Sequence, residues 1–123
     1  MISYVTLGTN DLDRAAKFYD QVLAVVGAKR GLASERFISW AGPKGGPMLM
    51  AMKPHDGKAA TVGNGVMAAL AAQSPEQVKA IYDAAIAAGG TDEGAPGKRG
   101  PGVYAGYFRD LDGNKLNAIY FGS

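Results

Sequence analysis

The chain has 123 residues, of which 47% are hydrophobic and 20% are charged, and its formal net charge is +2. This balance is typical of one soluble globular domain, and it excludes a disordered chain. The basic residues form no stripe that would indicate a nucleic acid or a membrane surface as partner, and the absence of cysteine excludes disulfides and thiolate sites.

The first half of the chain predicts a strand, a helix and three further strands. Residues 2–8 alternate between polar and apolar side chains, as in a strand with one buried face. Asn10 or Asp11 can cap a helix that runs to about Val26, with an apolar stripe at helical spacing, and Gly27 ends it. The three strands that follow are expected at residues 29–32, 36–41 and 48–53.

The second half repeats this order. Residues 65–72 resemble a strand, and Ser74-Pro75-Glu76-Gln77 is a capping box with proline at the first helical position. The helix should end at Gly89-Gly90, before strands at residues 104–109 and 115–121 that are joined by an Asp/Gly/Asn turn. The glycine-rich residues 92–102 are predicted to form a mobile loop.

The repetition is confirmed by subtraction, since Tyr19 and Tyr82 are 63 positions apart (82 minus 19), as are Tyr4 and Met67. We therefore predict two modules, at about residues 1–60 and 64–123, within one domain. In each module the helix would pack against one face of the sheet and bury it. The other faces, placed side by side, would make a curved wall with a cavity.

This order of elements resembles the vicinal oxygen chelate superfamily, the group of glyoxalases, bleomycin resistance proteins and extradiol dioxygenases. The residues that carry the resemblance are the opening ISYVTLGTNDLDRAAKFYDQVL, the middle KPHDGKAATVGNGV and the ending FRDLDGNKLNAIYF. The resemblance implies an α+β fold of paired βαβββ modules. They would form a cup-shaped, eight-stranded mixed sheet with the helices on its outer face, across residues 1–123.

In the metal-using members of this superfamily, four side chains in the cup hold a divalent cation. Carried over by position, the resemblance puts Tyr4, Met50, Met67 and Asn117 at those sites. Methionine is a poor ligand for such ions, tyrosine is mostly protonated at neutral pH, and asparagine offers only a neutral carbonyl. We therefore expect no metal and no other cofactor here, although a divalent metal is usual for the family.

The same region suggests a ligand site. Met48, Met50 and Met52 alternate along one strand and share one face. Together with Met67 they favour an adaptable apolar wall for an apolar or aromatic small molecule. Ordinary core packing is the alternative. Trp40 and Tyr104 are further candidate ligand contacts. Tyr4 and Asn117 could hydrogen-bond the ligand, or instead bond each other and close the cavity.

Three other features have plainer interpretations. His55, the single histidine, lies in a polar turn and is expected to be an exposed loop residue. Asp110, Asp112 and Asn114 lack the length and the final glutamate of a calcium loop, so a hairpin turn is expected. The glycine-rich stretch lacks a phosphate-binding motif, although Lys98 or Arg99 could touch an anionic ligand at the mouth of the cup.

Two functional hypotheses follow. The first is a small-molecule binding protein of the bleomycin-resistance kind, a homodimer without the usual metal. The alternative is a lyase, isomerase or dioxygenase resembling glyoxalase I, whose catalytic residues the sequence does not identify. The cup can form within one chain or across two. No apolar run approaches the roughly 20 residues that span a bilayer, and no signal pattern opens the chain, so we expect a cytoplasmic protein without a membrane partner.

Overall fold

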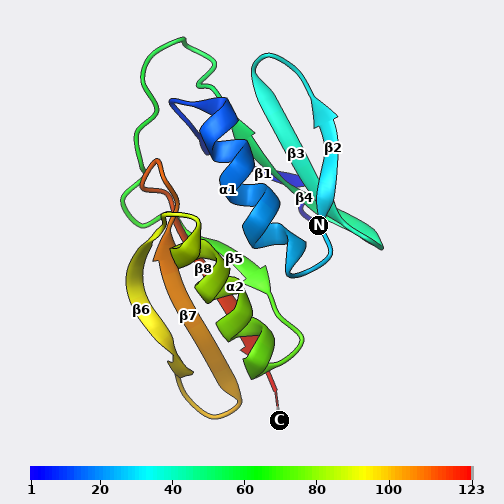
Figure 1. Ribbon diagram of the computed structural model, residues 1–123, viewed down its shortest axis with the longest axis vertical. Coiled ribbons are helices and arrows are strands. Elements are labelled where there is room, and N and C mark those ends of the chain that lie inside the picture. The colour runs from blue at the N-terminus through cyan, green and yellow to red at the C-terminus, as the bar shows by residue number, and fades with distance from the viewer. Residues whose placement is uncertain (123) are drawn as a thin grey trace.

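The computed structural model describes residues 1–122, which form eight strands and two helices. Figure 1 shows the two modules one above the other, with α1 in the upper module and α2 in the lower one. The elements in chain order are β1 (Tyr4–Gly8), α1 (Leu12–Ala24), β2 (Lys29–Ala33), β3 (Phe37–Gly42), β4 (Gly45–Met52), β5 (Ala68–Ala71), α2 (Pro75–Ala87), β6 (Thr91–Lys98), β7 (Val103–Arg109) and β8 (Lys115–Phe121).

The structure confirms the duplication. Each module has the order βαβββ, and both ends of α2 lie 63 positions after those of α1 (75 minus 12, and 87 minus 24). The strands form two four-stranded mixed sheets, ordered β1-β4-β3-β2 and β5-β8-β7-β6, in place of the single eight-stranded sheet that we expected. In both sheets the first strand pairs in parallel with the last, and the other pairs are antiparallel.

Both helices begin at the predicted caps. The carboxylate of Asp11 accepts a hydrogen bond from the backbone N–H of Arg14 at the start of α1. At the start of α2 the hydroxyl of Ser74 accepts a hydrogen bond from the backbone N–H of Gln77, and Pro75 is the first residue of the helix. Neither helix, at 13 residues each, is long or apolar enough to cross a membrane.

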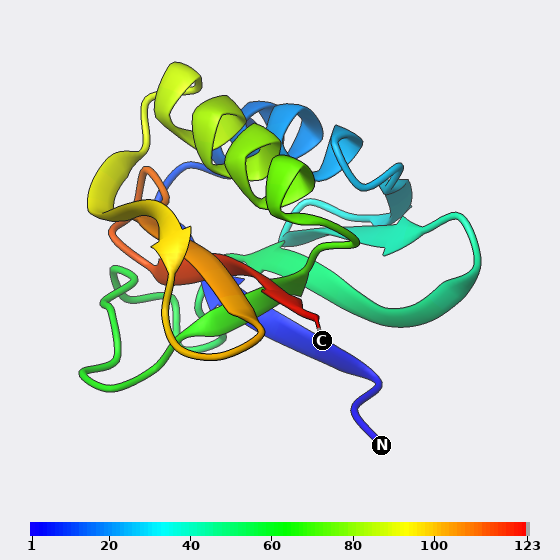
Figure 2. The same cartoon turned by 90° about the horizontal axis from the view of Figure 1, so that it is seen from below.

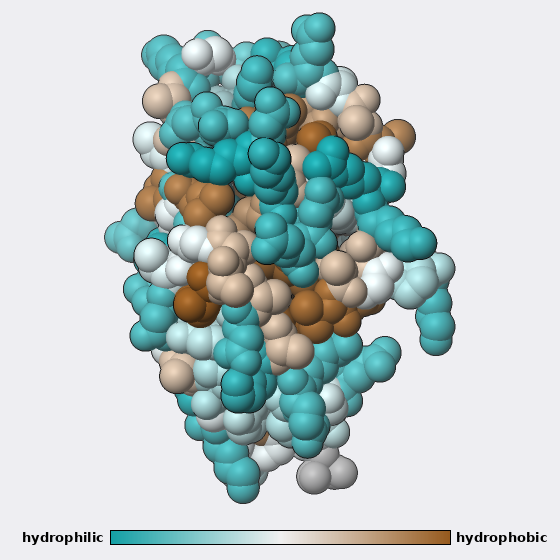
Figure 3. Space-filling model, in the orientation of Figure 1, coloured by the Kyte–Doolittle hydropathy of each residue, from teal (hydrophilic) through white to brown (hydrophobic). Residues whose placement is uncertain are grey.

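The two helices lie on the same side of the two sheets, as Figure 2 shows, and the core lies between helices and sheets. A single cluster of buried side chains continues from one module into the other, because α1 also packs against α2. Its largest fully buried members are Phe18, Tyr19, Trp40, Ile81, Phe108 and Leu116. In Figure 3 the side of the molecule that carries the helices is mostly hydrophilic, with hydrophobic patches near mid-height.

One prediction was wrong. Most of the glycine-rich stretch that we expected to be a mobile loop is strand β6, which pairs antiparallel with β7 and lies at the edge of its sheet. Its register shifts twice, between Asp92 and Gly94 and between Gly94 and Gly97. An edge strand with bulges tolerates glycine and proline, and it shows little of the side-chain alternation on which prediction depends.

A long connection, residues 53–67, joins the two modules and returns past the start of α1. It is held at Ala60, whose backbone N–H donates to Oδ1 of Asn10 at 2.6 Å and whose carbonyl accepts from Nδ2 of Asn10. His55 is exposed in this connection, as predicted. The connection ends at Met67, where the second sheet begins.

Candidate functional site

Each sheet has one face under its helix and one open face, and the strand register assigns residues to them. In the first sheet Tyr4 pairs with Met48, Thr6 pairs with Met50, and Ser39 pairs with Met50 from the other side. Paired residues and those two positions along a strand share a face. The open face of the first sheet therefore carries Tyr4, Thr6, Ser39, Met48, Met50 and Met52, and at its edge Lys29, which pairs with Ala41.

The open face of the second sheet is built in the same way from different residues. Asn117 pairs with Ala69 on one side and with Tyr107 on the other, and Arg109 pairs with Lys115. Met67 lies one residue before β5, on the side of Ala69 and Ala71. This face therefore combines an aromatic ring, a carboxamide and two cations.

The strand register makes four of the predicted site positions, Tyr4, Met50, Met67 and Asn117, equivalent in pairs. Thr6 pairs with Met50, and Ala69, which lies 63 positions after Thr6, pairs with Asn117. Met50 and Asn117 are therefore counterparts on the central strands of the two sheets. Tyr4 and Met67 are counterparts at the outer strands.

These four side chains differ in burial. Met50 and Asn117 are 5% and 1% exposed, whereas Tyr4 and Met67 are 50% and 42% exposed. The inner pair therefore lies at the bottom of the open faces, and the outer pair borders them. Within residues 1–122, Oδ1 of Asn117 is the one buried side-chain oxygen or nitrogen without a hydrogen-bond partner. Tyr4 therefore does not donate to this oxygen, which excludes the interpretation that the two residues simply close the cavity on each other.

The donors at these positions do not fit a divalent cation. Two thioethers, a phenol and a neutral carboxamide supply no imidazole and no carboxylate, which are the ligands such ions prefer. Among the residues that the structure describes, no three His, Cys, Asp or Glu side chains gather closely enough to hold a metal ion. The chemistry of this site is therefore that of hydrogen bonding and apolar contact.

Trp40 was predicted to contact the ligand, but the structure places it on the other face of its sheet. Its indole Nε1 donates to Oδ1 of Asp20 at 2.9 Å, and its ring packs against Tyr19 in the core. Hydrogen bonds from Arg30 and from Trp40 hold the pKa of the Asp20 carboxyl below its usual range. Trp40 fastens α1 to its sheet and does not reach the open face.

Tyr104 is also separated from the other candidates. It pairs with Tyr120, three residues from Asn117 along β8, and so lies on the helix-covered face and packs against the core. It borders a cavity of about 460 Å³ next to the turn between β6 and β7, together with Lys98, Pro101 and Tyr120. Residues an odd number of positions apart along a strand lie on opposite faces of the sheet. The sequence alone did not reveal which residues of neighbouring strands pair.

A second cavity, also of about 460 Å³, lies against the open face of the second sheet. Residues 62–67 of the connection form one side of it, and Arg109 and Lys115 form the other. Met67 belongs to this cavity. The cavity thus connects a predicted site residue with two cations, Arg109 and Lys115.

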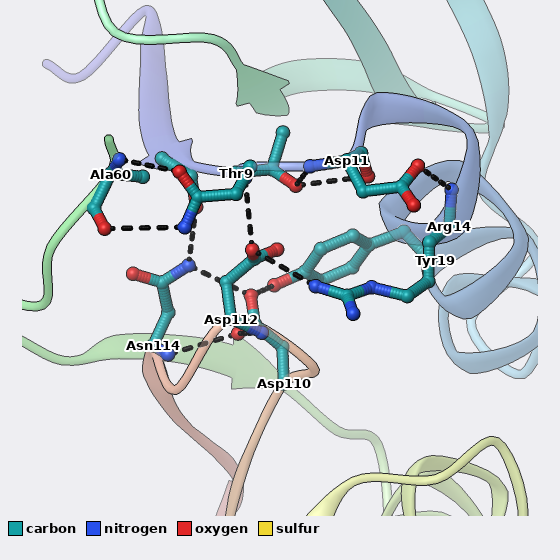
Figure 4. Close-up of polar contacts among 10 residues, drawn as sticks. Thr9, Asp11, Arg14, Tyr19, Ala60, Asp110, Asp112 and Asn114 are labelled. Carbon is teal, nitrogen blue, oxygen red and sulfur yellow. Dashed lines mark hydrogen bonds and ion pairs between the residues drawn. The ribbon is translucent and has the colours of Figure 1, made fainter. Parts of the chain in front are cut away.

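The acidic turn between β7 and β8 joins the two modules, and Figure 4 shows its contacts. Oδ2 of Asp110 accepts from the hydroxyl of Tyr19 at 2.5 Å and from Nδ2 of Asn114, and Oδ1 accepts two backbone N–H groups of the turn. Asp112 accepts from the N–H of Asn10 and from Arg14. Both carboxylate oxygens of Asp110 and Oδ1 of Asp112 are occupied in this way, so the turn acts as a structural clasp between the modules, in agreement with the predicted hairpin.

Comparisons with known proteins agree with this architecture. The family model described as the Glyoxalase/Bleomycin resistance protein/Dioxygenase superfamily matches residues 1–118. A glyoxalase/bleomycin resistance protein from Albidiferax ferrireducens T118 is 42% identical, with 97% of each chain covered and a TM-score of 0.89. No curated protein sequence matches the chain.

More distant solved structures share the fold alone. One is a glyoxalase/bleomycin resistance protein/dioxygenase family enzyme from Burkholderia phytofirmans PsJN, at 20% identity, 97% of each chain and a TM-score of 0.78. Another is a lactoylglutathione lyase from Agrobacterium tumefaciens, at 21% identity, 97% of this chain, 92% of that one and a TM-score of 0.73. With two βαβββ modules and a family match over nearly its whole length, the chain belongs to the glyoxalase/bleomycin resistance protein/dioxygenase superfamily.

Proposed function

We propose that this protein binds an apolar or aromatic small molecule in a cup made by the open faces of the two modules. The observation that carries the proposal is the pair of central positions. Met50 and Asn117 are buried at the bottom of the open faces, and Asn117 keeps an oxygen without a partner. A buried polar atom without a partner is costly. A ligand N–H or O–H donated to Asn117 would remove that cost.

The methionines supply the rest of the binding energy. Met48, Met50 and Met52 lie side by side on β4, where their flexible thioethers can adapt to an apolar surface. The four positions that the resemblance assigns to metal ligands carry weak donors here. Binding without metal-assisted chemistry is therefore the function that this site supports best.

A homodimer is part of the proposal. Within residues 1–122, β1 and β5 pair with a strand on one side only, and exposed apolar residues lie along or next to these strands. They include Tyr4, Val5, Val66 and Met67. A second copy would cover this surface and add its own open faces to the cup.

The test uses phenylnaphthylamine, an uncharged aromatic dye that fluoresces in apolar sites. We expect it to bind the protein and to raise its melting temperature, with no change on addition of EDTA. Met48→Lys should weaken binding by about tenfold, because it places a charge on the methionine wall. Ile86→Lys is the matched control, since Ile86 is an exposed apolar residue on α2, and it should leave binding unchanged.

The alternative is an enzyme, a lyase, isomerase or dioxygenase, which would use either a metal at the four positions or a catalytic base elsewhere in the cup. Elemental analysis of the purified protein tests for the metal. Stoichiometric zinc, nickel, iron or manganese that EDTA removes, with a loss of melting temperature, would contradict the proposal. Equal binding of the dye by Met48→Lys and by the unmodified protein would also contradict it.

A further inference from the structure

The two open faces occupy equivalent places in a duplicated fold, yet their chemistry differs. Met48 lies two residues before Met50 on β4, and Lys115 lies two residues before Asn117 on β8, so Met48 and Lys115 are counterparts. In the first module the counterpart position is uncharged, and the cation on this face that the register identifies, Lys29, lies apart from it on the edge strand β2, paired with Ala41. In the second module this face carries Lys115 with Arg109 paired beside it on β7.

The cations of the second face are only partly neutralised. Nε of Arg109 pairs with Oε1 of Glu93 at 2.9 Å, and its Nη1 donates to the carbonyl of Gly113. These two bonds fix the guanidinium and leave its other amino group available. Lys115 forms no ion pair with a carboxylate of the described residues.

The aromatic ring of Tyr107 makes cation–π contacts on this face of the second sheet. Nζ of Lys115 lies 5.6 Å from the centre of the Tyr107 ring, and the guanidinium carbon of Arg99 lies 5.5 Å from it. Two cations therefore flank the Tyr107 ring, and Arg109, held by Glu93, is paired with one of them, Lys115. The cavity of about 460 Å³ opens onto Lys115 and Arg109, and the unpartnered oxygen of Asn117 lies on the same face.

We propose that the ligand of this cup is an amphipathic organic anion. Its acidic group, a carboxylate or sulfonate, lies at Lys115 and Arg109, and its apolar body lies on the methionine wall of the first sheet. The carboxamide of Asn117 bonds a polar group between the two. This inference rests on the proposed function and refines it by naming the class of ligand. It holds whether the two faces come from one chain or from two.

Two dyes that differ by one acidic group test the proposal. Anilinonaphthalene sulfonate and phenylnaphthylamine have the same aromatic body, but only the first is an anion. We expect the sulfonate to bind about tenfold more tightly, because partly desolvated cations attract it. Added salt should weaken its binding and leave binding of the neutral dye almost unchanged.

The decisive variant is Lys115→Met, which gives the second module the residue of the first. We expect it to weaken binding of the sulfonate by about five- to tenfold and to leave binding of the neutral dye within about twofold. Lys17→Met, on the exposed side of α1, is the matched control and should change neither. Lys115→Gln should behave like Lys115→Met, and Lys115→Arg should retain tight binding of the sulfonate.

The outcomes distinguish this inference from the proposed function. If neither dye binds, the binding function itself is wrong. If the neutral dye binds and Met48→Lys weakens it, but the sulfonate binds no tighter than the neutral dye, the function stands and the anionic ligand is refuted. An equal effect of Lys115→Met on both dyes would also refute it.

Discussion

Two tyrosines at equivalent positions show how the same residue performs different work in the two modules. Tyr19 and Tyr82 are 63 positions apart, and each donates its hydroxyl to an aspartate. The partner of Tyr19 is Asp110 in the other module, and the bond is buried. The partner of Tyr82 is Asp92 in its own module, and that bond is exposed to solvent. Burial and the nearby Asp110 carboxylate raise the pKa of Tyr19 well above its ordinary value.

We expect Tyr19→Phe to lower the free energy of unfolding by about 1.5–3 kcal/mol, the range for a hydrogen bond to a charged group. Urea denaturation measures this loss. Tyr82→Phe removes the same atom from an exposed bond and should cost much less. Equal losses in the two variants would contradict the assignment of Asp110 and its turn as the clasp between modules.

The pKa of Tyr19 also predicts a dependence on pH. Because the folded pKa lies above the unfolded one, this hydroxyl contributes its stability fully below about pH 10 and loses it as the pH rises further. The unmodified protein should therefore lose stability more steeply above that pH than Tyr19→Phe does. A stability difference between the two proteins that stays constant into strong alkali would contradict this role of Tyr19.

At the scale of elements, prediction succeeded for helices with a periodic pattern of apolar side chains. It failed for a strand whose shape depends on glycines and bulges in the backbone. The helices were predictable from Ser74, Asp11 and their apolar stripes. Strand β6 was not, because its glycines and its bulges hide any alternation. The ends of the helices show the same limit. Gly27 adopts a left-handed conformation after α1, but Gly89, one position off the repeat, does so after α2.

That shift gives Gly90 a packing role. A Cβ atom at this position would lie 2.7 Å from the carbonyl oxygen of Arg109 and 2.8 Å from that of Ala85. Gly90→Ala should therefore lower the free energy of unfolding by about 1–3 kcal/mol through overpacking, as measured by urea denaturation. In Gly42→Ala the nearest atom to the new Cβ is 3.9 Å away, and a comparable loss there would contradict this explanation.

At the scale of the whole molecule, the modules pack through their helices and through the clasp, while β1 and β5 stay at the edges of the two sheets. The exposed apolar residues on and next to these strands would be costly in a monomer. We therefore expect light scattering after gel filtration to give about 25.4 kDa, twice the chain mass of 12.7 kDa.

The position of the interface is testable as well. Val5→Lys changes an exposed apolar residue on β1 and should weaken the dimer. Leu32→Lys makes the same kind of change on β2, at the opposite edge of that sheet, and should leave it intact. A monomeric protein, or dissociation caused by Leu32→Lys alone, would contradict this arrangement.

The sequence by itself determined the duplication and the two capped helices, because each depends on local residue types at fixed spacing. That Met50 and Asn117 occupy equivalent positions in the two modules also followed from the repeat. Only the tertiary structure decided which face each candidate occupies. Trp40 and Tyr104 lie under the helices, and Lys115 and Arg109 border the cavity, because strand register and the path of a connection join residues far apart in the chain.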